Sequence, residues 1–145
     1  MDLNDLMPAA EPVWFTLSDL SGNDMVSDGK PVRLRIHGPD SPVMLAFERA
    51  RTNKQLVAMK RRNRADLDVD AATLDDLATD QAVAALADWE FSGFTIDGKK
   101  APFSPENART LVTKVRWIRD WIVEKARDRG NFGRTTATDE TSPEN

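Results

Sequence analysis

The chain has no cysteine and no tyrosine, and only one histidine among its 145 residues. The absence of cysteine excludes disulfides, thiolate metal ligands and cysteine nucleophiles, and it fits a reducing compartment. No apolar run approaches the roughly 20 residues that span a bilayer. The opening MDLNDLMPAAEP is acidic, the reverse of a secretory signal. We therefore expect a cytoplasmic protein that is not inserted into a membrane.

Signatures of catalysis are also missing. The sequence contains no GxSxG nucleophile motif and no glycine-rich phosphate loop. His37 has neither a cysteine nor a second histidine as partner, and the carboxylates fall on predicted linkers and outer helix faces, where water solvates them. We expect no catalytic residue, no cofactor and no enzymatic activity.

The best candidate for a metal site is the acidic segment DLDVDAATLDDL. Asp66, Asp68 and Asp70 match the first, third and fifth ligand positions of a calcium-binding EF-hand loop. The match then fails, because Ala71 stands where the turn needs glycine and Leu77 where the loop needs a bidentate glutamate. The segment is interpreted as a solvated acidic linker, with no metal.

Composition along the chain predicts a flexible leader over residues 1–12, a single globular domain over 13–132 and a disordered tail over 133–145. The domain opens with two strand-like runs, Val13 to Asp19 and Val32 to His37. In the second run aliphatic residues alternate with Arg33, Arg35 and His37. This pattern predicts an antiparallel pair with one face on the core and the other wet and basic.

Two helices are predicted next. Ser41 and Pro42 are a typical cap and first residue, and that helix should run to about Asn63, with two apolar faces that suggest two neighbours. The second helix should begin at Thr73 and continue in helical spacing through Trp89. The first is basic from Arg49 to Arg64, and the second lies in an acidic stretch, so an antiparallel hairpin matched by charge is favoured over DNA contact.

The C-terminal third predicts a short extended excursion around an Asp97-Gly98 turn, then a helix capped by Ser104 that begins at Pro105 and ends before Gly130. One face of that helix is aliphatic, through residues such as Leu111, Ile118 and Ile122. The expected fold class is α+β, mainly helical, with three principal helices, a small N-terminal antiparallel strand pair and the excursion before the last helix.

The last predicted helix places Trp117 almost opposite its aliphatic face and Trp121 at the border of that face. Either another segment of the chain covers Trp117, or a partner does. Arg119 lies on the apolar side, where it can snorkel, pair with an acid between Asp66 and Asp80, or reach a partner carboxylate. Together with Phe132, these three residues are the partner-binding candidates.

The order of parts resembles that of the tail assembly chaperones of long-tailed, siphovirus-like phages and prophages. The resemblance covers Val13 to Phe132: a short β segment closed by GPDSP, a basic helix, an acidic helix ending in Trp89, then GFTIDGKKAPFSPENARTLV, a Trp-containing helix and a terminal RGNF. The region from Trp89 to Asn107 is its sharpest part.

The resemblance implies a non-enzymatic protein that binds the tape measure protein and assists polymerisation of the tail tube protein around it. Members of the family are absent from the finished particle, and many are also made in a longer, frameshifted form. A homo-oligomer is compatible with this assignment. Two alternatives stay open: a structural or connector protein retained in the virion, and a small DNA-binding regulator that uses the Arg49 to Arg64 helix.

Overall fold

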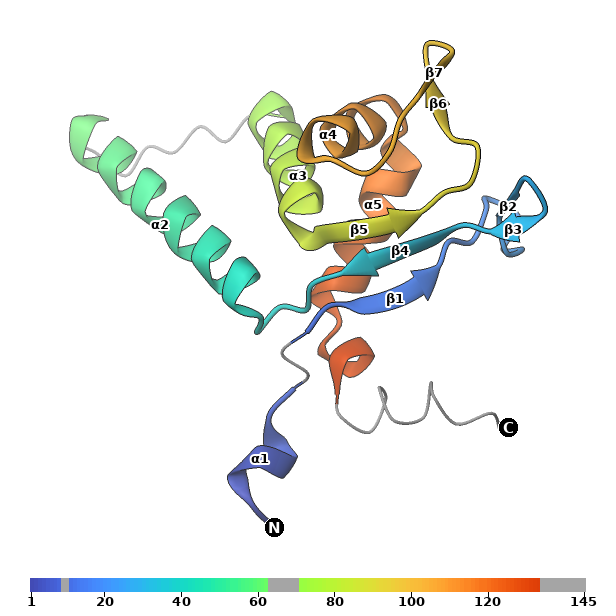
Figure 1. Ribbon diagram of the computed structural model, residues 1–145. Coiled ribbons are helices and arrows are strands. Elements are labelled where there is room, and N and C mark those ends of the chain that lie inside the picture. The colour runs from blue at the N-terminus through green and yellow to red at the C-terminus, as the bar shows by residue number, and fades with distance from the viewer. Residues whose placement is uncertain (9–10, 63–70, 134–145) are drawn as a thin grey trace.

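The computed structural model describes residues 1–8, 11–62 and 71–133, and its fold is α+β, as predicted (Figure 1). The helices are α1 (Leu3–Leu6), α2 (Pro42–Arg62), α3 (Ala71–Ala85), α4 (Pro105–Lys114) and α5 (Arg116–Arg127), followed by a 3-10 turn, η1 (Arg129–Phe132). The strands are β1 (Val13–Thr16), β2 (Val26–Ser27), β3 (Lys30–Pro31), β4 (Arg33–Ile36), β5 (Leu86–Glu90), β6 (Thr95–Ile96) and β7 (Lys99–Lys100).

An antiparallel sheet in the order β1-β4-β5 forms the centre of the fold. β1 pairs with β4 so that Val13 lies opposite Ile36 and Phe15 opposite Leu34, which confirms the predicted strand pair. Leu34 and Ile36 are fully buried, whereas Arg33 and Arg35 point to the other, partly solvated face. The alternation in the sequence therefore predicted correctly which face of the sheet meets the core.

The third strand, β5, corrects the sequence prediction, which continued the second helix through Trp89. The helix ends at Ala85, and Leu86–Glu90 pairs with β4. Leu86 and Trp89 are three residues apart, a spacing that suits a helix; in the strand both reach the core because a bulge near Arg35 and Ile36 shifts the register. As a strand, this segment forms backbone hydrogen bonds with the second edge of β4, and this pairing is favoured over a continued helix despite the helical spacing.

The excursion before α4 agrees with the prediction. β6 and β7 form a two-stranded hairpin, and the two residues that connect them, Asp97 and Gly98, both have positive φ (53° and 79°). Positive φ at both central positions is the geometry of a type I′ turn, for which the Asp-Gly pair is a preferred sequence. The rings of Phe94 and Phe103 pack edge-on against Trp89, at centroid distances of 5.6 and 5.2 Å, and so attach the excursion to the sheet.

Helix α2 begins as predicted but packs differently. The amide of Met44 donates to Ser41 Oγ at 3.2 Å, which caps the helix, and α2 continues to Arg62, with Asn63 outside the described residues. The helix projects from the body, and α3 is the neighbour against which it packs most (Figure 1). The predicted second neighbour is not found within the described chain, because Leu45 and Leu56 remain 42% and 51% exposed.

The start of α3 also differs from the prediction. The helix begins at Ala71, so Thr73 lies inside its first turn and does not cap it. The predicted start of this helix at Thr73 is therefore corrected to Ala71. The EF-hand-like ligands Asp66, Asp68 and Asp70 lie outside the described residues.

The long C-terminal helix of the prediction is two helices, α4 and α5, divided at Val115 (φ −117°, ψ 85°). Ser104 caps α4 as predicted, accepting from the amide of Asn107 at 3.0 Å, and Pro105 is the first residue. The amides of Ile118 and Arg119 then donate to the carbonyl of Val115 and begin α5 in a new direction. No glycine or proline marks this break in the sequence.

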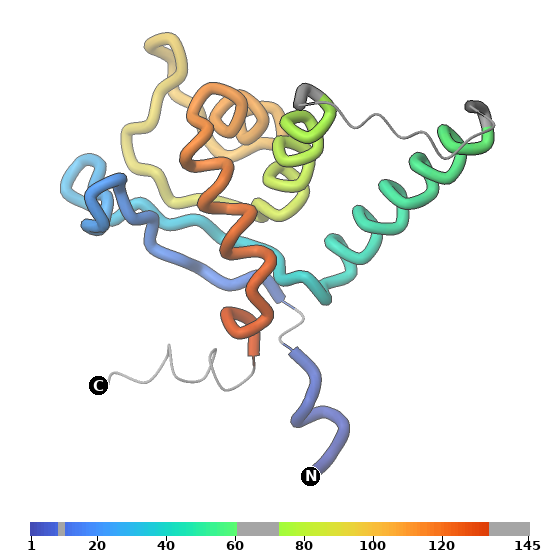
Figure 2. Tube along the Cα trace, turned by 180° about the vertical axis from the view of Figure 1, so that it is seen from behind, coloured from blue at the N-terminus to red at the C-terminus, as the bar shows by residue number. Residues whose placement is uncertain are grey.

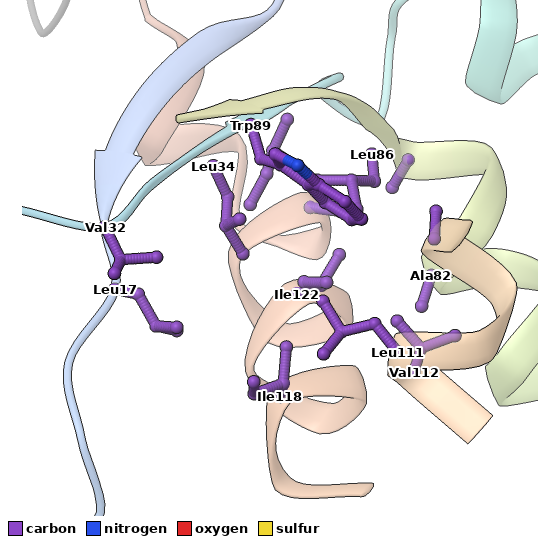
Figure 3. Close-up of a cluster of buried hydrophobic side chains, with 14 of the residues drawn as sticks. Leu17, Val32, Leu34, Ala82, Leu86, Trp89, Leu111, Val112, Ile118 and Ile122 are labelled. Atoms are coloured by element: carbon purple, nitrogen blue, oxygen red, sulfur yellow. The ribbon is translucent and has the colours of Figure 1, made fainter. Parts of the chain in front are cut away.

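The core lies between the sheet and the helices α3, α4 and α5. Viewed from behind, α5 crosses the face of the sheet that carries Leu34 and Trp89 (Figure 2). Those side chains point toward Ile118 and Ile122 of α5 and toward Leu111 of α4 (Figure 3). None of the described helices is both long and apolar enough to cross a bilayer.

Candidate functional site

The four residues predicted to bind a partner belong to α5 and η1, and the structure divides them into two pairs. Phe132 is 0% exposed and Arg119 is 6% exposed, whereas Trp117 and Trp121 are half-buried at the surface. The binding roles predicted for all four remain predictions. The structure adds the intramolecular contacts that each side chain makes.

Arg119 pairs with an acid of the predicted segment. Its guanidinium lies 2.6 Å from Asp75 Oδ1 on α3 and 3.0 Å from Asp120 Oδ1, and Arg116 reaches the same Asp75 oxygen at 2.8 Å. The hydrogen bond from Arg119 lowers the pKa of the Asp75 carboxyl below its ordinary value of 3.8. The same bond raises the pKa of Arg119, against the effect of burial. A buried cation is thus satisfied by two carboxylates, and it joins α3 to α5.

Phe132 closes the base of the core. Its ring lies edge-on to Phe15 of β1, with 5.7 Å between centroids. A Cβ built on Gly38 would lie 2.7 Å from the Phe132 ring, so any larger residue at position 38 would displace that ring. The terminal RGNF turn is therefore part of the packed domain. Arg129 fixes the same turn through two contacts to the Asp40 carboxylate, at 2.8 and 3.1 Å.

An aromatic flank runs along the side of α5 next to β1. We define it as Trp117, Trp121, Phe15 and Lys125. Trp121 and Phe15 pack edge-on at 6.4 Å, and the Lys125 ammonium lies 5.6 Å from the Trp121 ring centre and 5.8 Å from that of Phe15. All four side chains are half-buried. The flank is an aromatic surface where α5 meets β1, with a cation at one end.

The break at Val115 leaves the predicted angular position of Trp117 unchanged, because within α5 it lies roughly 140° around the axis from the centre of Ile118, Ile122 and Ala126. Trp117 is partly buried and packs against the core cluster. Its own chain thus covers part of the ring, the first of the two interpretations, and the exposed remainder is available to a partner.

Two members of the flank, Phe15 and Lys125, were missed as site residues. The alternation of β1 could have identified Phe15, because it follows Trp14 and must point to the opposite face of the sheet. Trp14 indeed lies on the outer face, where Arg33 and Arg35 stand over its ring at 5.1 and 5.8 Å. Lys125 carries no comparable signal beyond its spacing of four from Trp121.

Among the side chains that the structure describes, the charge-matched hairpin predicted between α2 and α3 shows no ion pair. Two acids of α3 pair with arginines of the C-terminal helices: Asp75 with α5, and Asp80 with Arg109 of α4 at 3.0 Å. Among the described basic side chains of α2, the one ion pair is between Arg51 and Glu48 of the same helix. The side chains of Arg61 to Arg64, at the centre of the predicted DNA-binding run, lie outside the described residues.

Two other kinds of site were considered in the sequence, a metal site and a site built on His37. Residues 1–8, 11–62 and 71–133 contain no group of three or more His, Asp or Glu side chains that could hold a metal ion. His37 follows β4 and is partly buried, and burial together with the charge of Arg35 lowers its pKa from 6.5. What α5 presents is a half-buried aromatic platform with Lys125 over it.

The fold and this flank thus define a small α+β protein with an aromatic surface on its last helix. A model of the YdaY prophage protein family matches residues 43–141, and the chain belongs to that family. The matched region runs from α2 through η1 and includes Trp117, Trp121 and Lys125, while Phe15 and β4 lie outside it. Neither the curated proteins nor the solved structures that were searched contain a match.

Proposed function

We propose that this prophage protein is a non-enzymatic tail assembly chaperone, acting in the host cytoplasm. In this proposal it binds the tape measure protein and assists the tail tube protein to polymerise around it. Membership of a prophage family supports the phage context. The resemblance of the segment from Trp89 to Asn107 to tail assembly chaperones supports the finer assignment.

The observation that carries the proposal is the aromatic flank. A tape measure protein presents long amphipathic helices, and an apolar ridge on a rigid helix can bind such a segment by packing against its apolar face. The tryptophans are only partly buried in the free protein, so they retain apolar area for a client. A limited aromatic patch with a charged border also favours reversible binding, which a chaperone needs in order to release its client.

The test is co-purification with the tape measure protein encoded by the same prophage. Replacing Trp117 or Trp121 with alanine should reduce recovery of the client about tenfold or more, because a buried interface tryptophan contributes 2 kcal/mol or more. Trp14→Ala is the matched control. That ring is also half-buried, but it lies on the opposite face of the sheet and should leave recovery unchanged.

Equal recovery with Trp117→Ala, Trp121→Ala and Trp14→Ala would remove the flank as the client site. Gene order supplies an independent test, since a tail assembly chaperone should be encoded between the tail tube gene and the very long tape measure gene. The protein should also be absent from purified virions. Its presence there would favour the structural or connector alternative.

The DNA-binding alternative retains one supporting observation, which is that Asp75 and Asp80 of α3 pair with arginines of α5 and α4. It predicts binding to duplex DNA that weakens steeply with salt. It also predicts loss of that binding in an Arg49→Ala, Lys60→Ala variant. Such a result, together with no binding to the tape measure protein, would replace the proposal.

A further inference from the structure

The outer side of α2 is apolar and basic and has no neighbour within the described chain. Leu45, Arg49, Leu56 and Lys60 fall within roughly 60° of one another around the helix, and we call them the outward stripe. All four are exposed. The opposite side of α2 is the one that faces α3, through Phe47 and Ala58. The stripe therefore points away from the body.

The exposed helix α2 is also strongly basic. α2 contains six arginines and lysines and a single acid, Glu48. Within the described residues Arg49 and Lys60 have no carboxylate at ion-pair distance. The helix is 21 residues long, or about 32 Å. An exposed helix with an apolar and basic side, projecting from the domain (Figures 1 and 2), is suited to an acidic, apolar groove.

Such a groove exists on the same molecule, between α3 and α5. It has a volume of about 520 Å³. Its floor is apolar, made by Leu74, Leu77, Ala78 and Val123, and Leu74 is 56% exposed. Its rim carries three acids, Asp120, Glu124 and Asp128, and one base, Arg127.

We propose that the α2 helix of a second copy of this chain occupies the α3/α5 groove, with its outward stripe against the groove floor. The exchange is reciprocal, because each copy has one stripe and one groove, and it closes as a two-fold dimer. Charge complementarity between the basic helix and the acidic rim supports this occupant. The helix cannot fill the groove of its own copy, because it packs on α3 through its other side.

The dimer is inferred from surfaces distinct from the aromatic flank, so its failure would leave the proposed function untouched, and the reverse.

Sedimentation velocity over a range of protein concentrations measures the monomer–dimer equilibrium. The natural sequence should form dimers, and Leu56→Asp should weaken them about tenfold or more, because it places an acid in an acidic groove. Leu20→Asp is the matched control: this leucine is 78% exposed, lies between β1 and β2, and should leave the dimer unchanged.

Charge reversal provides the sharper test. Lys60→Glu combined with Arg49→Glu makes the stripe acidic, and Glu124→Lys reverses one rim charge. Each variant alone should lose the dimer. An equimolar mixture should recover it, because each altered stripe or groove then meets a complementary surface. Circular dichroism and thermal unfolding should show that both variants remain folded.

Several outcomes would overturn the inference. A natural chain that is monomeric at all concentrations would do so, as would a dimer that survives both Leu56→Asp and the charge reversals. Failure of the mixture to recover the dimer would also count against it. The N-terminal leader is another apolar surface that could form a dimer contact, since Leu3 and Leu6 are 71% and 66% exposed. Loss of the dimer in Leu3→Ser, Leu6→Ser with no effect of Leu56→Asp would assign the contact to the leader.

Discussion

Helices α2 and α4 begin with the same Ser-Pro pair, but the α4–α5 region is packed in the core whereas much of α2 is exposed. Ser41-Pro42 starts α2 and Ser104-Pro105 starts α4, and in both cases the serine hydroxyl accepts from the amide three residues later, at 3.2 and 3.0 Å. The α4–α5 region then buries its apolar residues against the sheet and α3. α2 leaves four large apolar residues exposed.

This comparison shows that the capping residue determines where a helix begins, whereas the distribution of apolar residues around the helix determines whether it is packed. α5 concentrates Ile118, Ile122 and Ala126 on one side. α2 spreads its apolar residues around the axis and mixes them with cations, so no single contact can bury them all. Such a helix is stabilised by its N-terminal cap, by the side that packs on α3 and by whatever it contacts outside the domain.

The largest expected effect is in the packed region. Phe132→Ala should reduce the free energy of unfolding by about 3–5 kcal/mol, because it opens a cavity under Phe15 and Gly38. Urea unfolding at equilibrium measures the change. Phe132→Leu should recover much of the loss. A cost near zero for Phe132→Ala would mean that η1 is not part of the core.

The ion-pair network between α3 and α5 should give the next effect, and it should depend on pH. The pKa of Asp75 is below 3.8 in the folded protein, so its contribution to stability is present above that value and is lost as the pH falls through the folded pKa. Asp75→Asn should lower Tm at neutral pH, and its Tm should approach that of the natural chain in acid. A difference in Tm that stays constant across this range would contradict the pairing.

His37 should give the smallest effect, in the opposite region of the sheet. Because its pKa is lower in the folded protein than the ordinary 6.5, the unfolded chain takes up the proton first. Stability should therefore fall as the pH drops below about 6.5, and this loss should be absent from His37→Gln. Thermal melts of both proteins between pH 5 and 8 make the comparison. Parallel melting curves would exclude a role for His37.

The sequence predicted the elements that depend on local chemistry. The alternation from Val32 to Ile36, the Asp97-Gly98 turn and both Ser-Pro helix starts were found where expected. Of the three roles considered for Arg119, the structure shows the pairing with an acid from the Asp66 to Asp80 segment. Each of these rests on contacts within a few residues or on a charge that must be satisfied once buried.

Prediction failed where distant partners decided the outcome. Leu86 and Trp89 satisfy a helical spacing, and only the vacant edge of β4 makes them a strand. The break at Val115 has no glycine or proline signal, so one continuous helix was predicted where the structure has two. The exposed stripe of α2 was predicted as a second packing face, because an apolar pattern does not reveal whether its partner lies in the same chain.

Hydrogen exchange tests the contrast between the two regions most directly. At protein concentrations low enough to keep the chain monomeric, amides from Lys54 to Lys60 should exchange through local opening, orders of magnitude faster than those from Ile118 to Ala126, which should exchange only on global unfolding. Raising the concentration should slow exchange in α2 by blocking its local opening, and it should also slow α5, because a dimer stabilises the folded chain against global unfolding. Equal protection of the two helices at low concentration would contradict the account.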